Sequence, residues 1–413
     1  MPDTNSKTVA IIGQGYVGLP LAMAAIRSGW TVIGIDNSIE RVRGINSGQS
    51  PVEDVSDEEL DAALSSKLFI ASSDFSEVSK ASVVTICVPT PLNINREPDL
   101  SMLEAAALAI APNLSDKTLV ISESTSFPGT LRDYIIPLIE NLKANQGNSY
   151  FYASAPERVN PGDKQWNQRN TPRLVGSIDE ESAEAAMGFY SSICDSAIRV
   201  ATPEIAEAAK LLENTFRLTN IALVNEFAKL CSSANIDINQ VIDAASTKPY
   251  GYMEFRPGVG VGGHCIPVDP LYLTWWARKI GMRAELVETA DSINSEMPSF
   301  VASKALEIIG DRIQNPRVLV LGVAYKAGIA DVRESPVSGL IDALRGKGAE
   351  VAWHDPLVKF WNGKESEAIT WPCDIAIVAT NQPGLEIELL LRSGTRILDC
   401  TNSFSSYEKL FYL

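Results

Sequence analysis

The chain has 413 residues, of which 45% are hydrophobic, enough for two or three domains with substantial cores. Its formal net charge of -16 argues against nucleic acid or an anionic membrane as a main partner. No apolar run of about 18 residues and no signal-like N-terminus are present, so we expect a cytoplasmic protein. Six cysteines without a C-x-x-C pair, and only two histidines, predict neither a disulfide framework nor a metal site.

The first predicted elements are a strand, a glycine-rich turn and a helix. The apolar run Thr8–Ile12 leads into Gly13, Gly15 and Gly18, and residues 19–26 have helical composition. In a dinucleotide-binding turn the first glycine permits the bend, the second admits the pyrophosphate, and the third allows close packing of helix and strand. Because the turn joins a strand to a helix, the pattern G-x-G-x-x-G indicates a dinucleotide site here.

A second predicted strand, residues 31–35, ends at Asp36, about 20 residues after the glycines. A carboxylate at this place binds the ribose hydroxyls and disfavours a 2′-phosphate, which predicts NAD as the cofactor. The alternative is that Asp36 is an ordinary turn residue beside Asn37. The cofactor contacts expected in this region are Gly13, Gly15, Tyr16, Val17, Gly18, Asp36 and Arg41.

Further polar loops follow the predicted strands 82–88 and 118–121. In an open parallel sheet such loops surround the ligand crevice at the carboxyl ends of the strands. Candidates near the nicotinamide and the reacting carbon are Thr90, Glu123 and Thr125, although ordinary turn chemistry would also explain any single one of them. Residues 153–162 contain a similar break, and it carries Glu157.

A long helix is predicted from Pro203 to about Cys231, because a threonine, a proline and an acidic residue mark its start and no glycine or proline interrupts it. Lys210, Asn214 and Arg217 fall on one stripe of this helix. The stripe is either a solvated face or a set of donors for an oxygen that gains negative charge.

Four glycines between Gly258 and Gly263 precede Cys265, and this spacing presents a thiol on backbone that a substrate can approach closely. Asp269 and Pro270 resemble the N-cap and first turn of a helix over residues 271–278, which favours the thiolate of Cys265. The alternatives are a packing role for the cysteine and a simple capping role for Asp269.

The last third repeats the strand and helix pattern of the opening. Strands are expected at 317–321, 350–354 and 374–378, with a helix starting at residues 335–336. The full glycine pattern is missing, so we expect a nucleotide to bind differently, with Lys326 and Arg333 on its phosphates. Surface solvation of both side chains is the alternative.

Five ordered motifs together resemble the UDP-glucose/GDP-mannose dehydrogenase family over nearly the whole chain. They are Gly13 to Gly18, Glu157 after Pro156, Lys210 with Asn214, Gly262 to Cys265 with Asp269, and Lys326 through Asp331, Arg333 and Ser335. The resemblance implies an α/β protein with two Rossmann-like doubly wound domains joined by a long central helix and a helical dimerisation region. It places NAD binding in residues 1–200, dimerisation and the catalytic cysteine in 201–300, and UDP-sugar binding in 301–413.

The family resemblance also implies roles for individual residues. The expected catalytic residues are Cys265, Lys210, Asn214, Asp269, Glu157 and Thr125, which act through a thiohemiacetal and a thioester on the cysteine. NAD contacts extend to Pro89, Thr90, Thr125 and Arg333. The expected substrate contacts are Glu157, Arg158, Val159, Lys210, Asn214, Arg217, Tyr250, Tyr252, Arg256, Gly262 and Lys326.

Within the family, the sequence resembles dehydrogenases of UDP-N-acetylglucosamine and UDP-N-acetylmannosamine. Val268 and Pro161 replace a lysine and an acidic residue found in other branches. Against this branch, Val259 stands where the acetamido-sugar enzymes often have proline, and Arg256 lies where UDP-glucose enzymes have a basic contact to uridine diphosphate. The expected function is four-electron oxidation of C6 of a UDP-N-acetylhexosamine by a homodimer, for surface polysaccharide precursors. The alternatives are a UDP-glucose or GDP-mannose 6-dehydrogenase, a two-electron dehydrogenase with Cys265 as a packing residue, and a catalytically silent nucleotide-binding protein.

Overall fold

A computed structural model describes residues 7–143, 148–159, 165–310, 313–404 and 409–413 of the chain. The chain divides into two compact units, Met1–Glu213 and Asn214–Leu413. Each unit contains its own largely parallel β-sheet with helices on both faces. The predicted α/β class with two doubly wound domains is therefore confirmed.

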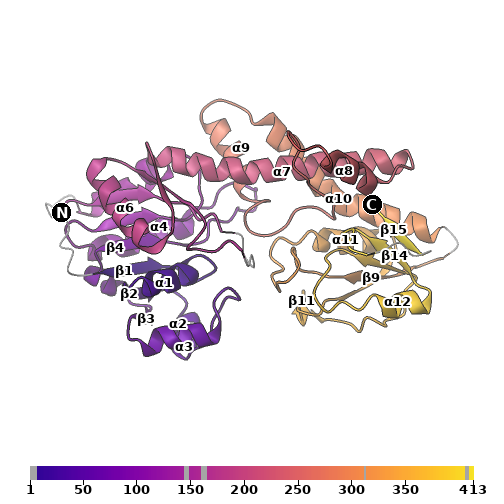
Figure 1. Cartoon of the computed structure of the whole chain (residues 1–413), viewed down its shortest axis with the longest axis horizontal. Helices are drawn as coiled ribbons and strands as arrows, with labels where there is room; N and C mark the ends of the chain where they lie inside the picture. Colours follow the sequence, from indigo (N-terminus) through magenta and orange to yellow (C-terminus); the bar gives the residue numbers. More distant parts are fainter. Residues whose placement is uncertain (1–6, 144–147, 160–164, 311–312, 405–408) are drawn as a thin grey trace. The chain divides into compact units, whose positions relative to one another are not determined.

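The first unit is built on an eight-stranded sheet in the order β3-β2-β1-β4-β5-β6-β7-β8 (Figure 1). All neighbouring strands are parallel except β6 and β7. The chain order reverses between β1 and β4, and ligands bind at such switch points outside the carboxyl ends of the strands. The strands are β1 (Thr8–Ile12), β2 (Thr31–Ile35), β3 (Phe69–Ser72), β4 (Val83–Ile86), β5 (Leu119–Ser122), β6 (Phe151–Ser154), β7 (Arg173–Ser177) and β8 (Ala197–Val200).

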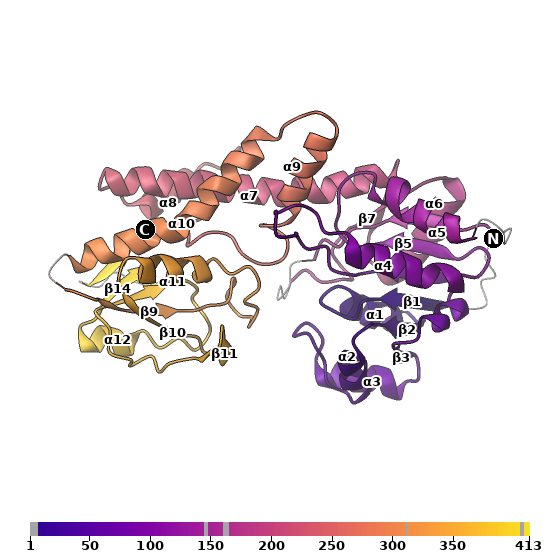
Figure 2. The same ribbon diagram turned by 180° about the vertical axis from the view of Figure 1, so that it is seen from behind.

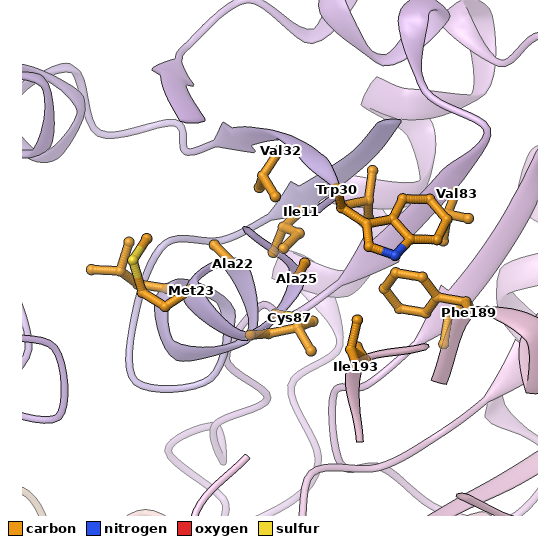
Figure 3. Packing of buried hydrophobic residues seen from close by; sticks show 14 of the residues in the cluster. Ile11, Ala22, Met23, Ala25, Trp30, Val32, Val83, Cys87, Phe189 and Ile193 are labelled. Carbon is orange, nitrogen blue, oxygen red and sulfur yellow. The ribbon is translucent and has the colours of Figure 1, made fainter. Parts of the chain in front are cut away.

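Helices cover both faces of this sheet because the strand side chains alternate between two apolar clusters. Ile11 and Val32 pack toward one cluster, where the rings of Trp30 and Phe189 meet edge to face at 5.1 Å (Figure 3). The helical segments are α1 (Gly18–Arg27), α2 (Ile39–Asn46), α3 (Asp57–Ser65), η1 (Phe75–Lys80), α4 (Ser101–Ile110), η2 (Ala111–Asn113), η3 (Leu131–Ile135), α5 (Ile136–Lys143) and α6 (Glu180–Ile193). Helices α1 and α6 contribute to that cluster, and α4, η3 and α5 contribute to the other.

The long predicted helix is α7 (Pro203–Ser233), and the boundary between the two units falls within it. Its buried Glu207 accepts hydrogen bonds from the backbone N–H groups of Gly129 at 2.7 Å and Leu131 at 3.0 Å, at the start of η3. At β7, a Cβ on Gly176 would lie 2.2 Å from the Thr202 carbonyl oxygen, so glycine is required where α7 begins.

The second unit contains a five-stranded parallel sheet in the order β10-β9-β13-β14-β15. Helices α10 and α11 pack on one face and α12 on the other (Figure 2). The strands are β9 (Arg317–Leu321), β10 (Glu350–His354), β13 (Ile375–Val378), β14 (Arg396–Asp399) and β15 (Leu410–Tyr412), beside the small pair β11 (Phe360–Trp361) and β12 (Lys364–Glu365). The helices are α8 (Ile238–Ser246), α9 (Asp269–Lys279), α10 (Glu285–Ile309), α11 (Val337–Gly346) and α12 (Glu388–Ser393).

Both sheets use the same device after their first strand. Gly13 and Gly322 both have positive φ, and a Cβ on either would lie within 2.6 Å of a carbonyl oxygen in the loop that follows the neighbouring strand. An aspartate directly follows β2 and another directly follows β10. Asp36 accepts from the N–H of Gln14, and Asp355 accepts from the N–H of Val323.

Some predicted ends of elements are wrong. The strand expected over 82–88 is regular only over Val83–Ile86, and the helix expected from residues 335–336 begins at Val337. Among the residues that the structure describes, every helix is too short or too polar to span a membrane.

Candidate functional site

The turn after β1 has the shape that close approach of a diphosphate requires. Gly13 has φ of 93°, and a Cβ on it would lie 2.6 Å from the Cys87 carbonyl oxygen. A Cβ on Gly18 would lie 1.8 Å from the Gly13 carbonyl oxygen, so only glycine lets α1 begin this close to β1. A Cβ on Gly15 would meet nothing within 4 Å, which shows open space at this position. The turn therefore fits a pyrophosphate bound at a helix N-terminus.

Asp36 is buried at the carboxyl end of β2, and its carboxylate is held by three donors. Its Oδ2 accepts from the N–H of Gln14 and from Nη1 of Arg41, both at 2.9 Å. Its Oδ1 accepts from the N–H of Ser38 at 2.9 Å. The carboxylate thus lies immobilised at the place where a dinucleotide ribose would meet it.

The other expected cofactor contacts in this unit belong to the same carboxyl edge. The hydroxyl of Thr90 donates to the carbonyl oxygen of Thr125 at 2.7 Å, which ties the loop after β4 to the loop after β5. Pro89 is exposed beside it, Val17 is the residue that precedes α1, and Tyr16 is half-buried.

Glu157 follows β6 and is surrounded by donors. Its Oε1 accepts from the N–H of Arg158 at 2.6 Å and from the N–H of Val159. Its Oε2 accepts from Nη2 of Arg173 at 2.8 Å and from Nε2 of Gln168 at 2.7 Å. Burial acts to raise the pKa of Glu157, but Arg173 and these hydrogen bonds outweigh it and the pKa lies below its ordinary value.

Lys210 lies buried on α7, and its charge also lowers the pKa of Glu157. The neighbouring Arg158 is attached to the same helix through Glu213, with Nη2 and Oε1 separated by 2.7 Å. Its Nη1 donates to the Pro172 carbonyl oxygen at 2.7 Å. The first unit thus brings together four of the expected substrate contacts: Glu157, Arg158, Val159 and Lys210.

In the second unit the later glycines of the glycine-rich loop pack against polypeptide that leaves no room for side chains, whereas a Cβ on Gly258 would meet nothing within 4 Å. A Cβ on Gly262 would lie 2.7 Å from Cβ of Tyr325, and Gly263 has φ of 85° with its N–H donating to the Arg333 carbonyl oxygen. At the start of the loop, the N–H of Gly258 donates to Oδ1 of the fully buried Asn225 at 3.0 Å. Gly262 and Gly263 are therefore needed for close packing within the unit, and the approach of a substrate to this backbone stays a prediction.

Cys265 is exposed, four residues before α9 begins. Its carbonyl oxygen accepts from the N–H groups of Val268 at 3.2 Å and Asp269 at 2.8 Å. The predicted N-cap role of Asp269 is wrong: this turn makes Val268 the preceding residue and Asp269 the first residue of the helix. The buried carboxylate of Asp269 instead accepts from the side-chain amide of Asn214, so these two candidates do meet.

The remaining substrate candidates of the central segment lie in more exposed places. Arg217, Tyr250 and Tyr252 are exposed, and the Tyr250 side chain is 73% exposed. Arg256 pairs with Asp243 and with Glu254 at 2.7 Å. Pro161, one of the residues used to choose the branch of the family, lies outside the described residues.

A pocket of about 390 Å³ opens in the second unit beside the glycine-rich loop. Lys326 lines it together with Gly258, Gly260, Thr380, Asn381 and Thr401. Arg333 forms an ion pair with Asp331, with Nη2 and Oδ2 separated by 2.6 Å. A lysine, backbone without side chains and several hydroxyl or amide groups form a suitable lining for a nucleoside diphosphate.

Sequence reasoning missed the groups that hold these candidates in place. Arg173 and Gln168 fix Glu157, and Asn225 fixes Gly258 while donating to Oδ1 of Asn294 at 2.8 Å. A charged residue at the first position of the buried strand β7 was the only sequence signal for Arg173. In the part of the chain that the structure describes, no three His, Cys, Asp or Glu side chains form a group that could hold a metal ion.

Three family models match this chain, and together they extend over most of its length. They are described as the NAD binding domain of the UDP-glucose/GDP-mannose dehydrogenase family at residues 7–194, its central domain at 204–296, and its UDP binding domain at 319–403.

Individual relatives agree with these matches. The UDP-N-acetyl-D-mannosamine dehydrogenase of Pyrococcus horikoshii is 36% identical over 91% of this chain and 89% of the relative. The UDP-N-acetyl-D-glucosamine 6-dehydrogenase of Pseudomonas aeruginosa is 34% identical over 88% of this chain and 86% of the relative. A solved structure of the Pyrococcus horikoshii UDP-D-ManNAc dehydrogenase superposes with a TM-score of 0.89 at 33% identity, covering 98% of both chains.

Proposed function

Because this chain belongs to the UDP-glucose/GDP-mannose dehydrogenase family of NAD-dependent nucleotide-sugar dehydrogenases, we propose that it oxidises C6 of a UDP-N-acetylhexosamine to the carboxylate. The sugar is of the GlcNAc or ManNAc type. The observation that carries this proposal is the exposure of Cys265, since the structure describes all six cysteines and the other five are buried or half-buried. The loop before Cys265 also lines the pocket that contains Lys326.

The chemistry proceeds through the cysteine sulfur. Oxidation of the C6 alcohol first gives the aldehyde. The Cys265 thiolate adds to this aldehyde to give a thiohemiacetal, oxidation of that adduct gives a thioester, and water hydrolyses the thioester to the acid. NAD, when bound, accepts the hydride in each of the two oxidations. Four electrons therefore leave the sugar and two molecules of NADH are formed.

Polar side chains of the chain assist these steps. Lys210 and Asn214 donate to the developing oxyanions, where loss of one donor costs on the order of 100- to 1,000-fold in rate. Asp269 and Glu157 are the acid–base candidates, and Thr125 positions the water. The hydrogen bond from Asn214 to Asp269 supports a shared role for this pair.

The identities of the relatives support the acetamido sugar. Both relatives named above are dehydrogenases of UDP-N-acetylhexosamines, and Val268 lies where UDP-glucose and GDP-mannose enzymes commonly carry lysine. We further propose that the product is a precursor of surface polysaccharide. The cytoplasm is the proposed location, since all six cysteines are described and none forms a disulfide, which is typical of a reducing compartment.

A panel of UDP- and GDP-sugars, assayed for NADH formation and product, tests the proposal. We expect turnover with UDP-N-acetylglucosamine or UDP-N-acetylmannosamine and two NADH per sugar. Preference for UDP-glucose or GDP-mannose would overturn the sugar assignment, and one NADH with released aldehyde would overturn the four-electron reaction. Tight NAD binding without hydride transfer to any sugar would identify a silent nucleotide-binding protein.

A further inference from the structure

Arg173, the first residue of β7, is a buried cation between two carboxylates. Its side chain is 2% exposed, and its guanidinium lies 3.1 Å from Oε2 of Glu123 through Nη1 and 2.8 Å from Oε2 of Glu157 through Nη2. Nη2 also donates to Oε1 of Gln168 at 2.6 Å, and Nη1 donates to the Ala155 carbonyl oxygen at 3.3 Å. The first unit contains all of these residues.

Both oxygens of the Glu157 carboxylate are held in this arrangement. Backbone N–H groups of Arg158 and Val159 donate to Oε1, while Arg173 and the Gln168 amide donate to Oε2. Hydrogen bonds to a charged group are roughly twice as strong as those between neutral groups. Rotation of the carboxylate would break at least one such bond on each oxygen, so its orientation is fixed.

We propose that Arg173 is a positioning residue of the dehydrogenase reaction, which holds the Glu157 carboxylate in one orientation and in its ionised form. Glu157 then acts on the substrate as a fixed hydrogen-bond acceptor at neutral pH and not as a proton donor. This inference depends on the proposed function, in which Glu157 contacts the sugar substrate.

The charges around Glu157 come from several elements. Arg173 of β7 and Lys210 of α7 favour its ionised form, while Glu123, in the loop after β5, opposes it. The thiols of Cys87 and Cys194 also interact electrostatically with Glu157.

The two carboxylates that share Arg173 behave differently. The pKa of Glu157 lies below its ordinary value although burial acts to raise it, because Arg173, the Val159 N–H, Gln168 and Lys210 act together. Burial raises the pKa of Glu123 to about 7 in spite of Arg173. Divergent values of this kind distinguish a carboxylate that stays ionised from one that takes up a proton near neutral pH.

The test compares Arg173→Met and Arg173→Lys with the wild type, using kcat/KM for the preferred UDP-sugar between pH 5 and 10. The pKa of Glu157 lies below its ordinary value of 4.5 in the wild type, so protonation of Glu157 falls below this pH range. We expect Arg173→Met to raise that pKa by about 1–3 units, the range by which a neighbouring cation shifts a carboxyl pKa, and so to bring an acidic limb, the loss of kcat/KM at low pH, into the measured range. Arg173→Lys should bring the limb back toward the wild-type position, since it keeps the charge although it loses the two-carboxylate fork.

Tyr190→Phe is the matched control. It removes the hydrogen bond from the tyrosine hydroxyl to Oε1 of Glu123 at 2.6 Å and leaves the four donors to Glu157 in place. We expect a lower melting temperature with an unchanged acidic limb.

If Arg173→Met lowered kcat/KM by the same factor at every pH, the inference would be overturned and the role of Arg173 would be structural only. If that variant does not fold, Gln168→Leu removes one donor from Glu157, and an acidic limb at the wild-type position in that variant would overturn the inference. A wild-type protein that forms no NADH from any UDP-sugar disproves the proposed function itself, and the inference falls with it.

Discussion

The six cysteines of this chain differ in how far they are exposed. Burial raises the pKa values of the thiols of Cys87 and Cys400, and it raises that of the half-buried Cys373 to about 11. A thiol must ionise to act as a nucleophile, so these three are poor candidates. Cys265 alone combines exposure with a position just ahead of a helix N-terminus.

Replacement of the proposed nucleophile gives the first prediction. Cys265→Ala should lower the rate of NADH formation by roughly 1,000-fold or more, because no thiohemiacetal can form without the sulfur. NAD binding should be retained, since the cofactor turn belongs to residues 13–18. Stopped-flow measurement of NADH together with a cofactor titration would check both parts.

Cys373→Ala is the control for this prediction, because it removes a half-buried thiol outside the glycine-rich loop. Its turnover should match that of the wild type. Normal turnover in Cys265→Ala would show that the cysteine is a packing residue and that the enzyme is a two-electron dehydrogenase.

At the scale of elements, Glu207 connects α7 to the start of η3. Burial raises its pKa to about 8, although two backbone N–H groups favour the ionised form. A carboxyl group whose pKa is raised in the folded state lowers the free energy of unfolding as the pH rises from the ordinary value of 4.5 toward 8. The loss is on the order of 1 kcal/mol for each pH unit in that interval.

The second prediction uses the variant Glu207→Gln, which cannot ionise. Because the wild type loses stability between pH 5 and 8 and the variant does not, we expect the melting temperature of the variant to rise relative to that of the wild type across this interval. Thermal melts across that range are the measurement. Glu180→Gln is the control: the hydrogen bond from Arg199 lowers the pKa of Glu180, so its contribution is already complete above pH 5 and the difference in melting temperature should stay constant.

The contact between β1 and α1 gives the third prediction. Gly18→Ala would place a Cβ 1.8 Å from the Gly13 carbonyl oxygen, so we expect a loss of about 1–3 kcal/mol of stability and weaker NAD binding. Gly188→Ala, inside α6, meets nothing within 4 Å and should be neutral or stabilise by roughly 0.5–1 kcal/mol. Urea unfolding distinguishes them, and equal stability of the two variants would contradict the packing argument.

Local signals predicted many elements well, because apolar runs and glycine turns act over short distances. The strands Thr8–Ile12, Thr31–Ile35 and Arg317–Leu321 have the predicted bounds. The role of Asp269 was missed because the turn at Cys265 supplies the helix start without a side-chain cap. The partners of Arg173 come from distant parts of the chain, and no local pattern brings them together.

At the scale of the whole molecule, α7 presents an apolar stripe made of Phe216, Leu223, Phe227 and Leu230. These side chains recur at helical spacing and are each 45–60% exposed in the single chain. Large exposed apolar side chains gathered on one helix face mark an interaction surface. The stripe supports the proposed homodimer.

The fourth prediction concerns this stripe. The wild type should sediment as a dimer at micromolar concentration, and Phe227→Glu should shift it toward monomer because a charge would be buried without a partner. Leu142→Glu, which changes an exposed leucine on α5, should leave the dimer intact. A monomeric wild type, or a Phe227→Glu variant that remains dimeric, would contradict the proposal.

Each of the two sheets begins with a glycine and an aspartate in equivalent places. In both strand–turn units a side chain at the glycine would clash with a carbonyl oxygen of the neighbouring loop. Both carboxylates are held by hydrogen bonds: Asp36 accepts from Gln14, Ser38 and Arg41, and Asp355 accepts from the N–H groups of Val323, Leu357 and Val358. Ala324 and Ala327 stand where the first turn has Gly15 and Gly18, so converting the second turn into a dinucleotide site would require glycines at both places.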